Sequence, residues 1–210
     1  EIGVRLVGSE MCIRDRYILM RCKRKLWSIG QIIYIFMTSA IYFSLIAAMT
    51  IVLNIRNIEY MNDWGKVLGT LAFSNVPLVK GTAVTISTYI LTYFTPAQAM
   101  FFTWLSSVLC GGILGLIIYG CNVISKSKVV GIAASGFLVI LSAAVSGNEM
   151  AQWFSPVSWT TLNKLDVGKL TQYPTFTYVM VVYMTAIIIL SVWIIKVIEK
   201  KDVGVMIREV

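Results

Sequence analysis

The feature that most constrains this chain is the placement of its charged residues. Four long stretches contain no Asp, Glu, Lys or Arg, and nearly every charge falls between them. The stretches are residues 26–55, 81–125, 129–148 and 170–195. A helix needs about 20 apolar residues to cross a bilayer, so each stretch is long enough to hold one crossing. The sequence therefore predicts an all-α integral membrane protein with four transmembrane helices, at about residues 29–53, 96–124, 129–147 and 175–197.

The first sixteen residues do not belong to this pattern. The run LVGSEMCIRD, residues 6–15, resembles the translation of a common transposase-based sequencing adapter. We therefore interpret residues 1–16 as a non-native segment and leave them out of the fold, as one would a cloning scar. On this interpretation the helical transmembrane domain covers residues 17–210, and we expect the natural protein to extend further upstream of Tyr17.

The basic residues predict the orientation of the helices. Lys and Arg gather on the cytoplasmic side of membrane proteins. If both ends of the chain are cytoplasmic, the inner segments carry 10 basic and 3 acidic residues, and the outer loops carry 5 basic and 4 acidic residues. The reverse orientation would invert this bias. We therefore expect a multi-pass protein of the bacterial plasma membrane with both ends in the cytoplasm.

Local signals predict where some helices begin. Thr95, Pro96 and Gln98 have the spacing of a capping box with proline at the first helical position, where the second crossing should start. Residues 81–95 are too short a segment to cross, and their alternating pattern favours a strand or an interfacial segment. The run SPVSWTTL, residues 155–162, predicts a short interfacial or reentrant helix in the last outer loop. An ordinary outer loop is the alternative there.

Small residues mark candidate helix contacts. Gly111 and Gly115 form a GxxxG pair, and Gly131 and Ser135 repeat the spacing on the next crossing. Small residues let membrane helices approach closely, so we expect the second and third crossings to pack through these faces. A contact between two copies of the chain is the alternative for the GxxxG pair. The hydroxyl residues within the crossings are expected to bond to their own helix backbone. These residues are Thr38, Ser39, Ser44, Ser106, Ser107 and Thr185.

Several classes of function are disfavoured by what the sequence lacks. Apart from Lys196 at the inner end of the last one, no Asp, Glu, Lys or Arg lies inside a predicted crossing. Coupled carriers usually keep such charges there, and intramembrane proteases need paired carboxylates or an activated nucleophile. The chain contains no His, and its cysteines have no metal-ligand spacing. The sequence therefore predicts a non-enzymatic protein without metal or cofactor, whose surroundings are the lipid bilayer and not nucleic acid.

The order of these parts resembles the C-terminal portion of an ABC-2-type permease, the membrane subunit of many bacterial ABC exporters. The basic, Trp-containing stretch YILMRCKRKLWSIGQ leads into the first crossing, and the short inner turn SKSK joins the second and third. The apolar outer run SPVSWTTL precedes the last crossing and a basic tail. The resemblance implies that the four crossings match the third to sixth helices of a six-helix permease, with two helices upstream.

The resemblance also implies partners. A separate ATPase subunit would hydrolyse ATP, and a second permease subunit would complete the export path. The candidate contact with the ATPase is the set Arg21, Lys23, Arg24, Lys25 and Trp27. A purely topology-setting role for this basic stretch is the alternative. The competing interpretation of the whole chain is a non-transporting membrane protein, such as an assembly, immunity or sensory partner of a larger complex.

Overall fold

The computed structural model describes residues 24–57, 64–66, 88–125, 128–145, 151–166 and 173–200. Within these ranges the regular secondary structure is entirely helical, apart from an isolated bridge between Asp166 and Thr175. The all-helical class predicted from the sequence is confirmed. Residues 1–16, Arg21 and Lys23 lie outside the described part of the chain.

Three of the described helices are long and apolar enough to cross a membrane. They are α2 (Arg24–Asn54, 31 residues), α5 (Pro96–Ser125, 30 residues) and α7 (Phe176–Lys200, 25 residues). At 1.5 Å per residue their lengths are about 46, 45 and 37 Å, against about 30 Å of hydrocarbon. The shorter apolar helix α6 (Lys128–Val145, 18 residues) is about 27 Å long. The three candidate spans indicate a multi-pass membrane protein.

The predicted start of the second crossing is confirmed in detail. Helix α5 begins at Pro96, directly after Thr95. The Thr95 backbone N–H donates to Gln98 Oε1 at 3.2 Å, and the Gln98 backbone N–H donates to Thr95 Oγ1 at 3.4 Å. This reciprocal pair is a capping box, which satisfies N–H groups that a helix N-terminus leaves without intrahelical partners.

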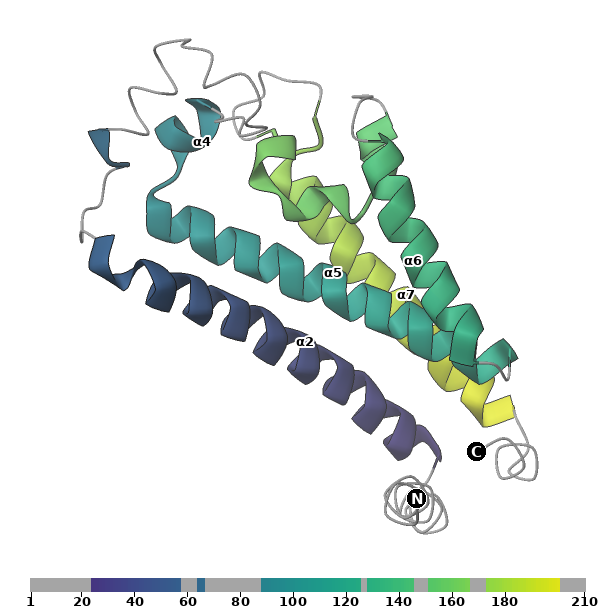
Figure 1. Cartoon of the computed structure of the whole chain (residues 1–210). Coiled ribbons are helices and arrows are strands. Elements are labelled where there is room, and N and C mark those ends of the chain that lie inside the picture. The colour runs from purple at the N-terminus through teal and green to yellow at the C-terminus, as the bar shows by residue number, and fades with distance from the viewer. Residues whose placement is uncertain are drawn as a thin grey trace.

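Helix α5 is the centre of the bundle. It packs against α2, α6 and α7, and α2 also contacts α7. Figure 1 shows α2 and α5 running beside each other, with α6 and α7 on the other side of α5. We call the end with the first turn of α2 and the last turns of α5 and α7 the terminal end. The opposite end, which holds residues 151–166, is the turn end.

Three glycines of α5, Gly111, Gly112 and Gly115, face α2, whereas Gly120 faces α7. A Cβ atom on Gly111 would lie 2.6 Å from Ser39 Oγ, and one on Gly115 would lie 2.5 Å from Ile35 Cγ2. Gly112 likewise faces the ring of Phe36. The second and third crossings do pack on each other as expected, but the GxxxG pair is not part of that contact, because α2 covers this face. Because α2 already packs on Gly111 and Gly115, these two glycines cannot also form a contact between two copies of the chain.

Two hydrogen bonds reinforce the contact between α2 and α5. Ser39 Oγ donates to the Val108 carbonyl oxygen at 3.1 Å, and Trp104 Nε1 donates to Ser44 Oγ at 3.1 Å. Such bonds between helices stabilise membrane bundles, where apolar burial alone gives little preference for helix over lipid.

Helix α6 approaches α5 through Gly131. Its backbone N–H donates to Asn122 Oδ1 at 3.2 Å, which satisfies a donor in the first turn of α6. A Cβ atom at Gly131 would lie 2.6 Å from the Ile118 carbonyl oxygen. Ser135, one turn further, is buried and donates to the Ile132 carbonyl oxygen at 2.9 Å. Gly131 and Ser135 thus lie on the buried side of α6.

Three other hydroxyl groups from the expected set bond to their own backbone, whereas Ser106 Oγ is buried and has no hydrogen-bond partner in the described part of the chain, against expectation. Thr38 Oγ1 donates to the Tyr34 carbonyl oxygen at 2.8 Å, and Ser107 Oγ donates to that of Thr103 at 2.8 Å. Thr185 Oγ1 donates to the carbonyl oxygen of Val182 at 3.0 Å. Ser39 and Ser44 differ, because they bond across the interface between α2 and α5.

The connecting segments contain short helical turns. After α2 comes η1 (Ile55–Asn57), and before α5 comes α4 (Thr88–Tyr93). The strand considered for residues 81–95 is wrong over residues 88–93, which form α4; residues 81–87 lie outside the described ranges. Between α6 and α7 the predicted short helix is instead three 3₁₀ turns. They are η2 (Ala151–Phe154), η3 (Ser158–Thr160) and η4 (Leu162–Lys164).

Replacing Gly131 by alanine tests the close approach of α5 and α6. The added methyl group would meet a backbone oxygen, which cannot move away as a side chain can, so Gly131→Ala should lower the free energy of unfolding by about 1–3 kcal/mol. Gly136→Ala on the same helix is the matched control, because nothing lies within 4 Å of the added atom. Thermal unfolding in detergent measures both variants. Equal stability of the two variants would contradict this packing.

Candidate functional site

Three regions of the structure are candidates for function: the terminal end, the turns at residues 151–166, and a cavity at the turn end. At the terminal end, Lys25 Nζ lies 2.6 Å from Glu199 Oε1. This ion pair joins the first turn of α2 to the last turn of α7. Both side chains are exposed enough for solvent to weaken the attraction, so the pair orients the helix ends more than it stabilises them.

Trp27 points into the bundle at the terminal end. Its ring packs against Tyr119 of α5, with ring centroids 6.2 Å apart. It also borders a buried cluster formed by Leu116, Ile194 and Ile198. Trp27 therefore joins α2 to α5 and α7, and its ring contacts residues of its own chain.

The predicted ATPase-contact set is thus divided by the structure. Trp27 is committed to internal packing, and Lys25 is paired with Glu199 while staying largely exposed. Arg24 is the first residue of α2. Sequence reasoning grouped these residues because they are adjacent, and it had no signal for Glu199 as a partner from the other end of the chain.

The turns at residues 151–166 are anchored deep in the turn end of the bundle. Tyr183 of α7 is fully buried, and its Oη donates to the Pro156 carbonyl oxygen at 2.6 Å. Cys110 Sγ of α5 lies 3.9 Å from the same oxygen. Trp159 is also buried, and its ring centroid lies 5.8 Å from that of Tyr183. The turns are therefore wedged between α5 and α7, and Trp159 faces protein where the sequence suggested the membrane interface.

The backbone of these turns is satisfied within the segment. Bonds of the i to i+3 type run along it, for example from Ser158 N–H to the Ser155 carbonyl at 3.1 Å. Trp159 Nε1 donates to the Gln152 carbonyl oxygen at 2.7 Å. At the far end, the Asp166 N–H donates to the Pro174 carbonyl at 3.1 Å, which brings the chain back to the start of α7. Irregular backbone can lie at membrane depth only when it is bonded and covered by protein in this way.

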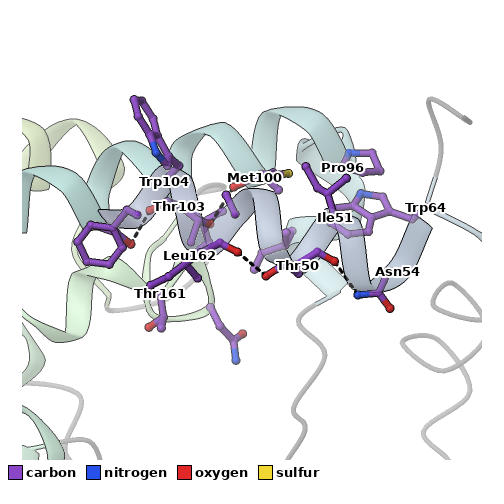
Figure 2. Close-up of a pocket in the computed structure, with 17 residues that line it drawn as sticks. Thr50, Ile51, Asn54, Trp64, Pro96, Met100, Thr103, Trp104, Thr161 and Leu162 are labelled. Atoms are coloured by element: carbon purple, nitrogen blue, oxygen red, sulfur yellow. Dashed lines mark hydrogen bonds between the residues drawn. The ribbon is translucent and has the colours of Figure 1, made fainter. Parts of the chain in front are cut away.

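An open cavity of about 730 Å³ lies at the turn end between α2, α5 and η4. Figure 2 shows Thr50 and Asn54 of α2 lining it together with Thr103 and Trp104 of α5. Its volume is in the range of ligand pockets in proteins. Sequence analysis did not find this cavity, because its walls come from segments far apart in the chain and carry no motif.

No cluster of His, Cys, Asp or Glu that could hold a metal ion occurs within the described ranges. Comparison of the chain with protein-family models, with curated proteins and with solved structures found no match.

The anchor of the turn segment can be tested with Tyr183→Phe. The variant keeps the buried ring and removes the donor to Pro156, so the free energy of unfolding should fall by about 1–2 kcal/mol. Release of the turns should also expose Cys110, which is now buried. Its modification by N-ethylmaleimide, measured by mass spectrometry with Cys12, Cys22 and Cys121 replaced by Ser, should become faster.

The matched control is Tyr178→Phe. Tyr178 is on the same helix and more exposed, and its ring contacts with Trp153 and Trp159 survive the change. Modification of Cys110 at the same rate in both variants would show that the Tyr183 hydroxyl does not hold the turns.

Proposed function

We propose that the chain is the membrane-spanning permease part of an ABC-2-type exporter, which moves substrate out of a bacterial cell with energy from a separate ATPase subunit. The observation that carries the proposal is the segment of 3₁₀ turns between α6 and α7, wedged into one end of the helical bundle. A reentrant-like segment before the last helix is what the resemblance to these permeases implies.

The proposal includes four crossings, with α6 as the third in order. Its 18 residues, about 27 Å, nearly match the thickness of the hydrocarbon layer. Both ends of the chain are then cytoplasmic, and residues 151–166 face the outside. The basic residues at the terminal end support this orientation.

The absence of Asp, Glu, Lys and Arg from the interior of the crossings supports an external energy source. A carrier driven by an ion gradient usually binds the ion at a charged residue inside the membrane. Here the described charged residues of the long helices, Arg24, Lys25, Lys196, Glu199 and Lys200, lie at the terminal end. Energy would then enter through this end, from an ATPase that contacts the basic stretch Arg21–Lys25.

The experiment is reconstitution of the chain in proteoliposomes with the ATPase encoded beside its gene. ATP hydrolysis should rise several-fold when the chain is present. Reversing charge with the pair Arg21→Glu and Lys23→Glu should remove most of the increase, because the contact is electrostatic. Arg208→Glu, at the other basic end, is the control and should have less effect.

Two outcomes would contradict the proposal. One is a gene neighbourhood without an ATPase that carries Walker motifs. The other is ATP hydrolysis that the chain leaves unchanged. Either would favour a non-transporting membrane protein that serves a larger complex.

A further inference from the structure

The cavity at the turn end has uncharged walls. None of its lining residues within the described ranges is Asp, Glu, Lys or Arg. Phe43, Ile46 and Ile51 of α2 face Met100 of α5 and Leu162 of η4 across it. An ion that entered would lose water without gaining a partner of opposite charge. The walls therefore favour an uncharged, largely apolar ligand.

The hydroxyl groups in the walls of the cavity already donate their hydrogens to backbone carbonyl oxygens. Each donates to a carbonyl oxygen three or four residues earlier in the chain, at 2.8–2.9 Å. The donations run from Thr50 to Ile46, from Thr103 to Ala99, from Ser107 to Thr103 and from Thr161 to Ser158. A hydroxyl has one hydrogen but two acceptor lone pairs. These four groups can therefore accept a hydrogen bond from a ligand but not donate one.

The tryptophans in the walls are also committed as donors. Trp64 Nε1 donates to the Phe94 carbonyl oxygen at 2.6 Å, and Trp104 Nε1 donates to Ser44 Oγ at 3.1 Å. Asn54 Nδ2 donates to the Thr50 carbonyl oxygen at 2.9 Å, and Figure 2 shows the Asn54 oxygen pointing away from this bond. Apart from the amide groups of Asn54 and Asn163, the polar side chains of the walls thus offer acceptors only, which a ligand hydroxyl can match and a carboxylate or phosphate cannot.

The dimensions of the cavity match one leaflet of a membrane. Its α2 wall runs from Phe43 to Asn54, and eleven helical steps measure about 16 Å. Half of a hydrocarbon layer of about 30 Å is about 15 Å. Along the α2 wall, the lining begins at the apolar Phe43 and ends at the amide of Asn54. A molecule with an apolar tail and a small polar head has the same change of polarity along its length.

We propose that this cavity binds one uncharged lipid of the surrounding membrane that carries a hydroxyl head group. The hydroxyl donates to Asn54 Oδ1 or Thr50 Oγ1, and the tail lies along Phe43 and Met100. The assignment uses only the lining of the cavity and does not depend on transport.

The first test measures selectivity for the head group. The purified full chain in detergent micelles is titrated with 1-monooleoylglycerol or with oleate at pH 9, and bound lipid is counted by native mass spectrometry. Both probes have the same tail, so the head alone differs. Monooleoylglycerol should saturate at one molecule per chain and bind at least tenfold more tightly than oleate. Equal affinity, or no saturable binding, would overturn the proposal.

The second test fills the cavity. Ala47 lines it, whereas the adjacent Ala48 is exposed on another side of α2. Ala47→Trp should weaken monooleoylglycerol binding at least tenfold, and Ala48→Trp should leave it unchanged. Equal binding by the two variants would place the lipid elsewhere and overturn the assignment.

A third measurement needs no variant and covers the case in which Ala47→Trp does not fold. A monoacylglycerol with a diazirine in its tail is photolysed with the wild-type chain, and the adducts are mapped by peptide mass spectrometry. Adducts should concentrate on residues 43–54 and 96–107. Adducts spread evenly over exposed apolar residues elsewhere, such as Ile33 and Phe137, would contradict a specific site.

Discussion

Every backbone N–H and C=O group at membrane depth must find its partner inside the protein, because hydrocarbon offers none. Continuous helices meet this constraint within α2, α5, α6 and α7. The turns at residues 151–166 satisfy backbone groups differently, with i to i+3 bonds along the segment and with Tyr183 donating to the Pro156 carbonyl. The polar turns can therefore lie inside an apolar bundle, and their position defines the turn end.

The two ends of the bundle differ in their packing. At the terminal end, Trp27 fills the space between α2, α5 and α7, and the Lys25–Glu199 pair joins the first and last described helices. Close contact continues along α2 through the glycine face of α5. Beyond Phe43 the two helices border an open cavity. This difference agrees with the proposed exporter, in which energy enters at the terminal end and lipid or substrate is met at the turn end.

The positions of the helices were predictable from the sequence, because charge placement and length decide which segments enter a bilayer. The start of α5 was predictable to the residue, because Thr95 and Gln98 form a local motif whose two bonds involve only neighbours. The helix that packs on the glycine face of α5 was not predictable from the sequence. Helix α5 is apolar on every side, so its sequence has no polar stripe to show which face meets protein and which meets lipid.

The candidate sites were less predictable than the helices. Glu199 follows Lys25 by most of the length of the chain, and the walls of the cavity come from α2, α5 and η4. Such groupings depend on how the helices cross, which a single sequence does not specify. The 3₁₀ turns were expected as a short helix because Pro156 and the aromatic residues around it are typical of helix starts at an interface. The buried contact of Trp159 with Tyr183 determines the observed shape.

The most direct test of the account is the side of the membrane on which each end of the bundle lies. Single cysteines replace Lys25, Thr161 or Lys196 in a chain without other cysteines, and a membrane-impermeant maleimide is applied to intact cells and to inverted vesicles. Four crossings predict that positions 25 and 196 react only in inverted vesicles and that position 161 reacts only in intact cells. Reaction of position 161 on the same side as position 25, with position 196 on the opposite side, would show that α6 does not cross and would contradict the account.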